Sequence, residues 1–272
     1  MNAKAKHYLA LAPAVLVSLF LMIVSGAPKL LVHNQAMTDM AVSVFGSVNI
    51  LYGIGVLEIL IAILLLIPRT RTLGFLMSVG LLGGATATGL TTDIEGMFWW
   101  FPLVVLALLM VTAYFTLPEL LDRAKGKPVP NTKSMTLRIF GWVLVLLLLA
   151  MHTMALQSKI LPPAEGTPGY AMSVALGMVG LEIPLLIVEV LTIVLFLIPR
   201  TSALGAVLMI GYMGGVLATF LTHNLNPPDA VVQLDRFTAS IPGIVMVAFT
   251  GIAVWIRNPE LARRLVKGKY PA

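Results

Sequence analysis

The sequence predicts an all-α integral membrane protein with eight transmembrane helices, arranged as two parallel four-helix bundle repeats with both termini cytoplasmic. Three observations lead to this prediction: few charged residues, apolar runs of membrane-spanning length, and an internal repeat. Of the 272 residues, 58 % are hydrophobic and 11 % are charged, and the mean hydropathy is +0.96. A soluble domain carries about 25 % charged residues, so this chain cannot build a water-soluble surface.

Eight apolar runs approach the roughly 17 to 25 residues that a helix needs to cross a bilayer core. They cover residues 8–24, 48–67, 72–90, 98–117, 136–155, 174–198, 202–222 and 239–256. The first run also resembles a secretory signal, because lysines precede it and the small residues Ser25, Gly26 and Ala27 follow it. We expect it to be retained as a span, since the repeat requires it as the counterpart of the fifth run.

The basic residues gather on one side of these runs, namely Lys4, Lys6, Arg69, Arg71, Arg123, Lys125, Lys127, Lys133, Arg138, Arg200, Arg257, Arg263, Arg264, Lys267 and Lys269. The opposite loops hold only Lys29, Lys159 and Arg236, together with Asp39, Asp93, Glu95, Glu165, Asp229 and Asp235. The positive-inside rule therefore places both termini in the cytoplasm, and a bacterial-type inner membrane fits this arrangement. Trp99 and Trp100 fall at the outer interface, where amphipathic rings are enriched.

The sequence contains an internal repeat. Residues 58–91 align with residues 189–222 at a constant offset of 131, and 17 of the 34 positions are identical. The identities include a glutamate, a Pro-Arg-Thr corner and several glycines, which apolar helices do not share by chance. Each unit has an even number of spans, so the two units face the same way, unlike inverted repeats. We assign 1–124 to the first unit, 125–135 to a basic cytoplasmic linker and 136–272 to the second unit with a short basic tail.

The repeated corner contains Arg69 in the first unit and Arg200 in the second. Proline ends the helix pattern, and the arginine anchors the corner at the lipid headgroups, which makes both arginines topology anchors. A ligand contact is the alternative reading of these two residues.

Small residues recur at helical spacing after each corner. They are Gly80, Gly84 and Thr88 in the first unit and Gly211, Gly215 and Thr219 in the second. The i, i+4, i+8 spacing puts them along one helix face, where two backbones can approach closely. We assign these faces to helix packing in the bundle core.

These motifs together resemble the DoxX and DoxX-like membrane family. The resemblance is carried by the Ser-Gly…Lys segment after the first run, the glutamate-led helix, Pro-Arg-Thr, and the Gly…Gly-Gly-Ala-x-x-Thr helix. Typical members are single four-helix units, which implies that this chain is a tandem fusion of two. Members are linked in name to thiosulfate:quinone oxidoreduction, to membrane complexes that handle oxidative stress, and to maturation of redox enzymes. The second unit lacks the glycine of the Ser-Gly motif.

One glutamate lies in the middle of a predicted span in each unit. Glu58 and Glu189 each precede the corner proline by ten residues, which puts them about 15 Å from the corner at 1.5 Å per residue. A carboxylate at this depth must pair inside the bundle or be protonated. Three readings remain open: a structural hydrogen bond, a proton relay, or a grip on the polar head of an apolar ligand.

The second unit carries further polar residues on the same side. Glu182 lies two turns from Glu189, His152 falls at a similar outer depth, and Lys159 lies at the mouth of this column. The first unit has Leu51 and Met22 at the positions of Glu182 and His152. The column could move protons or bind an anion, and it could equally be a satisfied buried group.

Several classes of chemistry are excluded. The chain has no cysteine, which excludes disulfide relays, thiolate metal sites and cysteine nucleophiles. The four histidines lack metal-ligand spacing, and no phosphate-binding glycine loop follows a strand. We therefore assign no catalytic residue and no metal ligand, and we expect the basic tail to contact anionic lipid and not nucleic acid.

Two functions fit the sequence, and a third needs a partner. The leading interpretation is a non-catalytic membrane component that binds a quinone-like or lipidic molecule and supports a membrane redox or envelope-maintenance complex. The alternative is a small-solute or proton-coupled transporter that uses the midplane glutamates. An enzyme subunit that exchanges electrons with quinone would need a partner, because no redox centre is visible. Quinone is the one candidate cofactor. The candidate partners are the lipid bilayer, a membrane redox protein or other protein, and a second copy of this chain.

The charge asymmetry yields the first test. Labels attached at residues 1 and 272 should both report from the cytoplasm, because the basic residues of both termini belong to the cytoplasmic side. The measurement is accessibility of the two labels in intact cells and in inverted vesicles. An external signal from either terminus would contradict the eight-span prediction.

Overall fold

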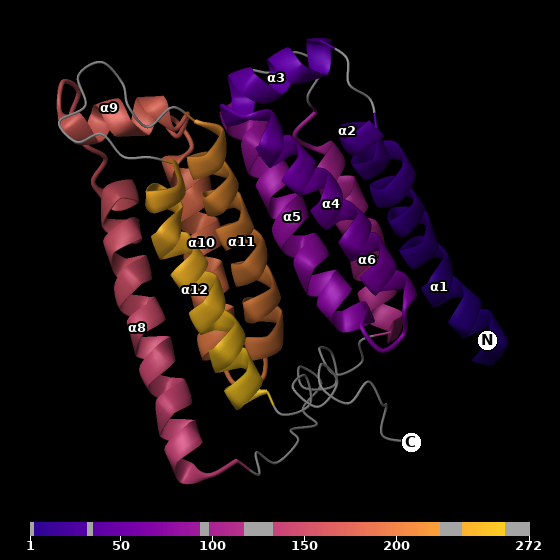
Figure 1. Ribbon diagram of the computed structural model, residues 1–272. Helices are drawn as coiled ribbons and strands as arrows, with labels where there is room; N and C mark the ends of the chain where they lie inside the picture. Colours follow the sequence, from indigo (N-terminus) through magenta and orange to yellow (C-terminus); the bar gives the residue numbers. More distant parts are fainter. Residues whose placement is uncertain (1–2, 32–34, 93–97, 117–132, 224–235, 259–272) are drawn as a thin grey trace.

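The computed structural model describes residues 3–31, 35–92, 98–116, 133–223 and 236–258, and these residues form helices and turns with no strand. Two groups of long helices stand side by side, and short helices lie across them at one end (Figure 1). Most of the predicted linker, the basic tail, and several of the counted loop charges lie outside the described residues.

The first bundle is built from the N-terminal half of the chain. Its elements are α1 (Ala3–Leu19), the π-helix η1 (Phe20–Gly26), α2 (Ala27–Leu31), α3 (Gln35–Phe45), α4 (Val48–Leu66), α5 (Arg71–Thr91) and α6 (Phe101–Thr116). Three of these elements, α1, η1 and α2, follow one another without a break, so a single rod runs past residue 24, where the predicted first span ends.

The second bundle repeats this order of long helices. Its elements are α8 (Met135–Ile160), α9 (Pro168–Ala175), α10 (Glu182–Leu197), α11 (Ser202–Thr222) and α12 (Arg236–Arg257). The short helices α3 and α9 lie at the same end of the molecule (Figure 1). Helix α8 continues five residues beyond the predicted limit of residue 155, which brings Lys159 into the helix.

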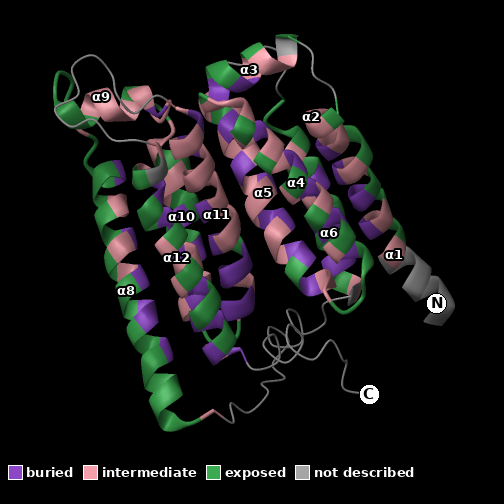
Figure 2. Cartoon of the chain, viewed as in Figure 1, coloured by how far each residue is buried: buried purple, intermediate pink, exposed green. Residues whose placement is uncertain are grey.

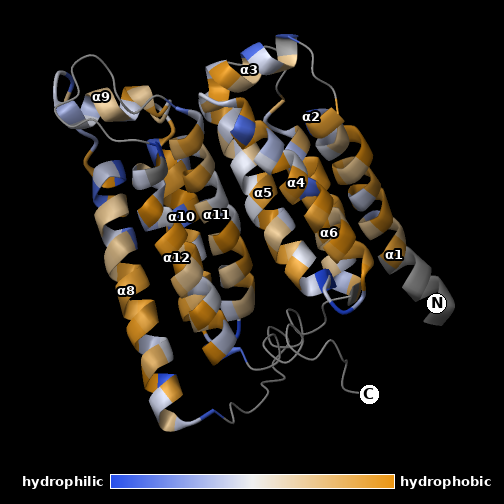
Figure 3. Cartoon of the chain, viewed as in Figure 1, coloured by the Kyte–Doolittle hydropathy of each residue, from blue (hydrophilic) through white to orange (hydrophobic). Residues whose placement is uncertain are grey.

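Six helical stretches are long and apolar enough to cross a membrane, by length and composition. They are Leu11–Leu31, Val48–Leu66, Arg71–Thr91, Met135–Ile160, Ser202–Thr222 and Thr238–Arg257. Large apolar side chains on their outer faces are exposed, such as Leu146 (62 %) and Met154 (76 %) on α8. Figures 2 and 3 show the same exposed, apolar outer surface along the helices. The chain is therefore a multi-pass helical membrane protein.

Two predicted spans are shorter than expected. Helices α6 and α10 each have 16 residues, which corresponds to about 24 Å at 1.5 Å per residue. The predicted run 174–198 is interrupted because Gly177 and Gly180 adopt positive φ angles of 62° and 83°. This left-handed conformation favours glycine and cannot continue a helix. Helix α10 therefore begins only at Glu182.

The two Pro-Arg-Thr corners have the same internal geometry. Thr70 Oγ1 donates a hydrogen bond to Leu64 O at 3.0 Å, and Thr201 Oγ1 donates to Leu195 O at 2.8 Å. Both hydroxyls thereby satisfy a carbonyl near the end of the preceding helix, where carbonyls lack helical partners. The predicted anchors, Arg69 and Arg200, are exposed at these corners.

The bundles meet where α5 packs against α11, and glycines make the contact. A Cβ on Gly83 would overlap the backbone of Gly211, and a Cβ on Gly214 would overlap the backbone of Gly80. The contact is reciprocal, because Gly80 and Gly83 occupy the positions that Gly211 and Gly214 occupy in the alignment. Each of the two helices therefore presents a pair of aligned glycines to the other.

The remaining small residues of the predicted packing faces lie along these same two helices. A Cβ on Gly84 would come 3.1 Å from Gly214 O, and one on Gly215 would come 3.3 Å from Ala87 Cβ. Thr88 and Thr219 are both buried. The glycines thus join the two bundles to each other, whereas we expected them to pack helices within each bundle.

The glycine contact yields the second test. Gly83→Ala should lower the free energy of unfolding by about 1–3 kcal/mol, because overpacking forces two backbones apart. Gly251→Ala is the matched control, since a Cβ there meets nothing within 4 Å. Thermal unfolding in detergent micelles measures both variants. Equal melting temperatures for the two variants would contradict the close approach of α5 and α11.

Candidate functional site

The first bundle contains an ion pair between α2 and α4, with a buried glutamate and a partly exposed lysine. Lys29 Nζ lies 2.7 and 2.6 Å from the two carboxylate oxygens of Glu58, and Ser25 Oγ donates to Oε1 at 2.9 Å. Lys29 Nζ also donates to Ser25 O at 3.1 Å. Ser25 and Lys29 share a helix face because they lie four residues apart. The carboxylate of Glu58 therefore has its cation and a hydroxyl donor on one neighbouring rod.

Glycines allow this rod to approach α4 closely. A Cβ on Gly26 would lie 3.1 Å from Gly55 O, and one on Gly55 would lie 3.0 Å from Gly26 O and from Lys29 Cβ. Any larger residue at these two positions would push Lys29 away from Glu58. Gly26 is the glycine of the Ser-Gly motif, and it also ends the π-helical segment.

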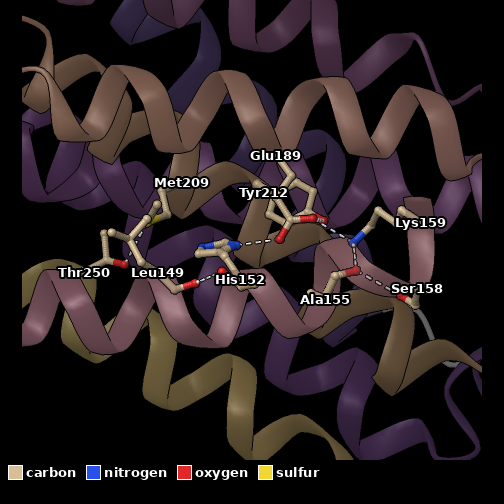
Figure 4. Close-up of polar contacts among 10 residues, drawn as sticks. Leu149, His152, Ala155, Ser158, Lys159, Glu189, Met209, Tyr212 and Thr250 are labelled. Atoms are coloured by element: carbon tan, nitrogen blue, oxygen red, sulfur yellow. Dashed lines mark hydrogen bonds and ion pairs between the residues drawn. The ribbon is translucent and has the colours of Figure 1, made fainter. Parts of the chain in front are cut away.

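The second bundle holds a larger polar cluster, which we call the Glu189 cluster: Glu189, His152, Lys159 and Tyr212 (Figure 4). His152 Nδ1 lies 2.5 Å from Oε1 of Glu189. Lys159 Nζ and Tyr212 OH donate to Oε2 at 2.7 and 3.0 Å. The side chains come from α8, α10 and α11, and Glu189 and His152 are fully buried.

The geometry of α8 explains how two of its residues reach one carboxylate. His152 and Lys159 are seven residues apart, so they lie on one face two turns apart. Helical side chains tilt toward the N-terminus, and the long Lys159 side chain can therefore turn back along α8 toward Glu189. Its ammonium group also donates to Ala155 O at 3.1 Å, which matches the contact of Lys29 with Ser25 O.

The hydrogen bonds of the cluster fix the role of the histidine ring. An ionised carboxylate only accepts hydrogen bonds, so His152 Nδ1 carries the proton that is donated to Glu189. In a neutral ring, Nε2 is then an unprotonated acceptor. This atom is buried and has no hydrogen-bond partner among the described residues. With a neutral ring, the cluster therefore presents one unsatisfied acceptor.

The structure brings together only some of the predicted site residues. Glu189, His152 and Lys159 meet, whereas Glu58 lies in the other bundle with its own lysine. Glu182 is partly exposed, and it makes no hydrogen bond or ion pair with another described residue. Glu182 is the first residue of α10, and it does not extend the polar column that we predicted from the sequence. Pro184 lies in the first turn of α10, where a helix does not need its N–H.

Three residues of the two sites were missed in the sequence. Lys29 was treated as a loop charge and as part of the Ser-Gly…Lys segment, and it was not named as a site residue. It stands opposite Lys159 in the sequence alignment and precedes its glutamate by a similar interval. Tyr212 occupies the position of Leu81 in the first unit, so the comparison of the repeats contained a signal for it. Ser25 was assigned to the small-residue end of the first run.

The buried ion pairs yield the third test. Lys159→Met should lower the free energy of unfolding by about 3–5 kcal/mol, because it leaves a buried carboxylate without its cation. Lys29→Met should lower the free energy of unfolding by a smaller amount, because the Lys29 side chain is 19 % exposed and the Lys159 side chain is only 6 % exposed. Thermal unfolding of the purified protein measures both effects.

The double variant Lys159→Met with Glu189→Leu serves as the control for this test. It should recover part of the lost stability, since no buried charge is left unpaired. The recovery is incomplete because His152 Nδ1 and Tyr212 OH lose their acceptor. A double variant as unstable as Lys159→Met would show that the ion pair is not the source of the effect.

Comparison with known families identifies one similarity. Residues 6–92 match the family described as methylamine utilisation protein MauE. The resemblance to the DoxX and DoxX-like family is therefore wrong, because the family that matches is a different one. No curated protein and no solved structure matches the chain. The match spans α1 to α5, so the part of this membrane protein that is similar to MauE contains the Lys29–Glu58 pair and ends before α6.

Proposed function

We propose that this protein is a non-catalytic accessory component of a membrane redox system, and that its second bundle binds the polar head of a quinone-like or lipidic molecule. The observation that carries the proposal is the Glu189 cluster, in which a buried ring nitrogen lacks a partner among the described residues. Buried polar atoms normally have partners, and each exception requires an explanation such as an absent ligand. A polar head group can supply the missing hydrogen bond.

The difference between the two bundles supports a binding role for the second. Lys29 and Ser25 donate three hydrogen bonds to the carboxylate of Glu58, and both come from the rod formed by α1, η1 and α2. The Glu189 cluster adds a histidine and a tyrosine at positions where the first unit has Met22 and Leu81. Intramembrane ionisable groups are expensive and are by default functional candidates. The first site therefore serves stability, and the second serves stability and recognition.

The chain's composition and its relatives support the accessory role. It has no cysteine, so electrons would have to pass through a bound molecule or a partner protein. The similarity of residues 6–92 to a methylamine utilisation protein supports a place beside a redox system. The basic corners and tail favour an inner membrane with both termini cytoplasmic.

We further propose that the two bundles are parallel repeats and that α6 and α10 complete eight spans. The matched corner hydrogen bonds and the reciprocal glycine contact support this arrangement. Two similar lysine–glutamate pairs support it as well. The units are 1–124 and 136–272, joined by the basic residues 125–135.

The ion pairs argue against the transporter alternative. Both midplane carboxylates already hold an internal ammonium group. A substrate cation would have to displace a tethered lysine, which acts at a high effective concentration. Binding of a neutral polar head next to the pair requires no such displacement.

Ligand retention yields the fourth test. Glu189→Gln should reduce the amount of co-purified quinone or lipid several-fold, because the neutral amide no longer orders His152 and Lys159 around one charge. Glu58→Gln is the matched control and should retain the wild-type amount. Mass spectrometry of organic extracts, normalised to folded protein, measures both variants. Equal retention in the two variants would contradict a binding site in the second bundle.

A further inference from the structure

Helices α8 and α10 each contain one buried polar atom that has no hydrogen-bond partner among the described residues: His152 Nε2 and Thr192 Oγ1. Thr192 follows Glu189 by three residues, so it lies on the same face of α10, one turn nearer the Pro-Arg-Thr corner. Figure 4 shows the second ring nitrogen of His152 facing away from Glu189, toward the side of Met209 and Thr250. Met209 precedes Tyr212 on α11 and therefore lies nearer to the Pro-Arg-Thr corner. Both unsatisfied atoms thus lie on the side of the Glu189 carboxylate that faces this corner.

This pair of atoms is specific to the second bundle. The positions of His152 and Thr192 correspond to Met22 and Ile61 in the first unit, and both of these are apolar. An apolar pair needs no hydrogen bond, whereas two unsatisfied polar atoms each carry a desolvation penalty. The second bundle therefore has two unsatisfied polar atoms at positions where the first unit has apolar side chains.

The charge balance of the cluster determines what this molecule must offer. Glu189 and Lys159 neutralise one another, so a neutral His152 keeps the buried cluster uncharged. A protonated ring would leave a net positive charge among apolar helices, which is unfavourable. Since Nδ1 donates its proton to Glu189, Nε2 of the neutral ring can only accept a hydrogen bond.

We propose that the Glu189 cluster selects the reduced, hydroxyl-bearing form of a quinone-type ligand, with the ligand hydroxyl donating to His152 Nε2. This inference rests on the proposed function and specifies the redox state of the ligand. A quinol hydroxyl donates one hydrogen bond and accepts another, so it matches an acceptor at His152 and the hydroxyl of Thr192. The carbonyl of an oxidised quinone only accepts, and its lone pairs would face the lone pair of Nε2.

Equilibrium binding of the two redox forms tests this inference on the full chain in lipid nanodiscs. The probes are decylubiquinol, kept reduced under anaerobic conditions, and decylubiquinone. We expect the wild-type protein to bind the quinol about 5- to 150-fold more tightly, since a mismatched buried acceptor costs on the order of 1–3 kcal/mol. This comparison needs no variant and is therefore independent of any folding defect.

Two substitutions locate the preference. His152→Met introduces the residue of the first unit, and it should reduce the quinol affinity to that of the quinone while the quinone affinity stays the same. Thr192→Val should reduce the preference for the quinol by a smaller factor. Ser18→Ala is the matched control, because Ser18 Oγ is also buried without a partner among the described residues but belongs to the first bundle. It should leave both affinities unchanged.

The outcomes separate this inference from the proposed function. Equal affinities of the wild-type protein for both forms would overturn the selection of quinol and leave a quinone-binding accessory protein. A quinol preference that survives His152→Met would overturn the assignment to His152. Binding of neither form would overturn both the inference and a quinone-type ligand, and would leave water as the partner of Nε2.

Discussion

A carboxylate buried among apolar helices must be matched by a cation, and this requirement shapes both bundles. Each carboxylate lies deep within a helix whose other side chains are almost all apolar. The matching lysine comes from the rod that precedes it, and it can reach the carboxylate only because that rod is helical well beyond its apolar run. Helix α8 extends to Ile160, and η1 with α2 extends the first rod to Leu31. The lengths of these rods therefore follow from the need to neutralise one charge.

The two bundles meet this requirement with different numbers of side chains. Around Glu58, one lysine and one serine of a single rod suffice. Around Glu189, the two helices α8 and α11 contribute three donors, and the ring of His152 is held by one nitrogen while the other has no partner among the described residues. A buried polar network is rigid where its hydrogen bonds are made, and each polar group in it that lacks a partner costs free energy. The second bundle thus combines a structural pair with an open hydrogen-bonding position.

The sequence predicted the features that follow from composition and repetition. It located the long apolar helices, and it singled out Glu58, Glu189, His152 and Lys159, which lie in the two ion-paired sites. It did not predict the break before α10, because positive φ angles at Gly177 and Gly180 depend on the packing of the turn and leave no trace in hydropathy. Lys29 was missed because a lysine at the end of an apolar run normally points to water, and only the fold shows it turned back to Glu58. The family was also misassigned, since glycine and corner motifs report helix packing, which different families share.

The reciprocal glycine contact between α5 and α11 also governs how the chain can assemble. Two bundles joined by a tether meet at an effective concentration that dilution cannot lower, so their pairing is independent of the amount of protein in the membrane. The contact occupies the glycine faces of both helices, and a second chain cannot use them. Further association must therefore proceed through other surfaces, and every complex that contains this protein holds the two unlike polar sites in a fixed one-to-one ratio.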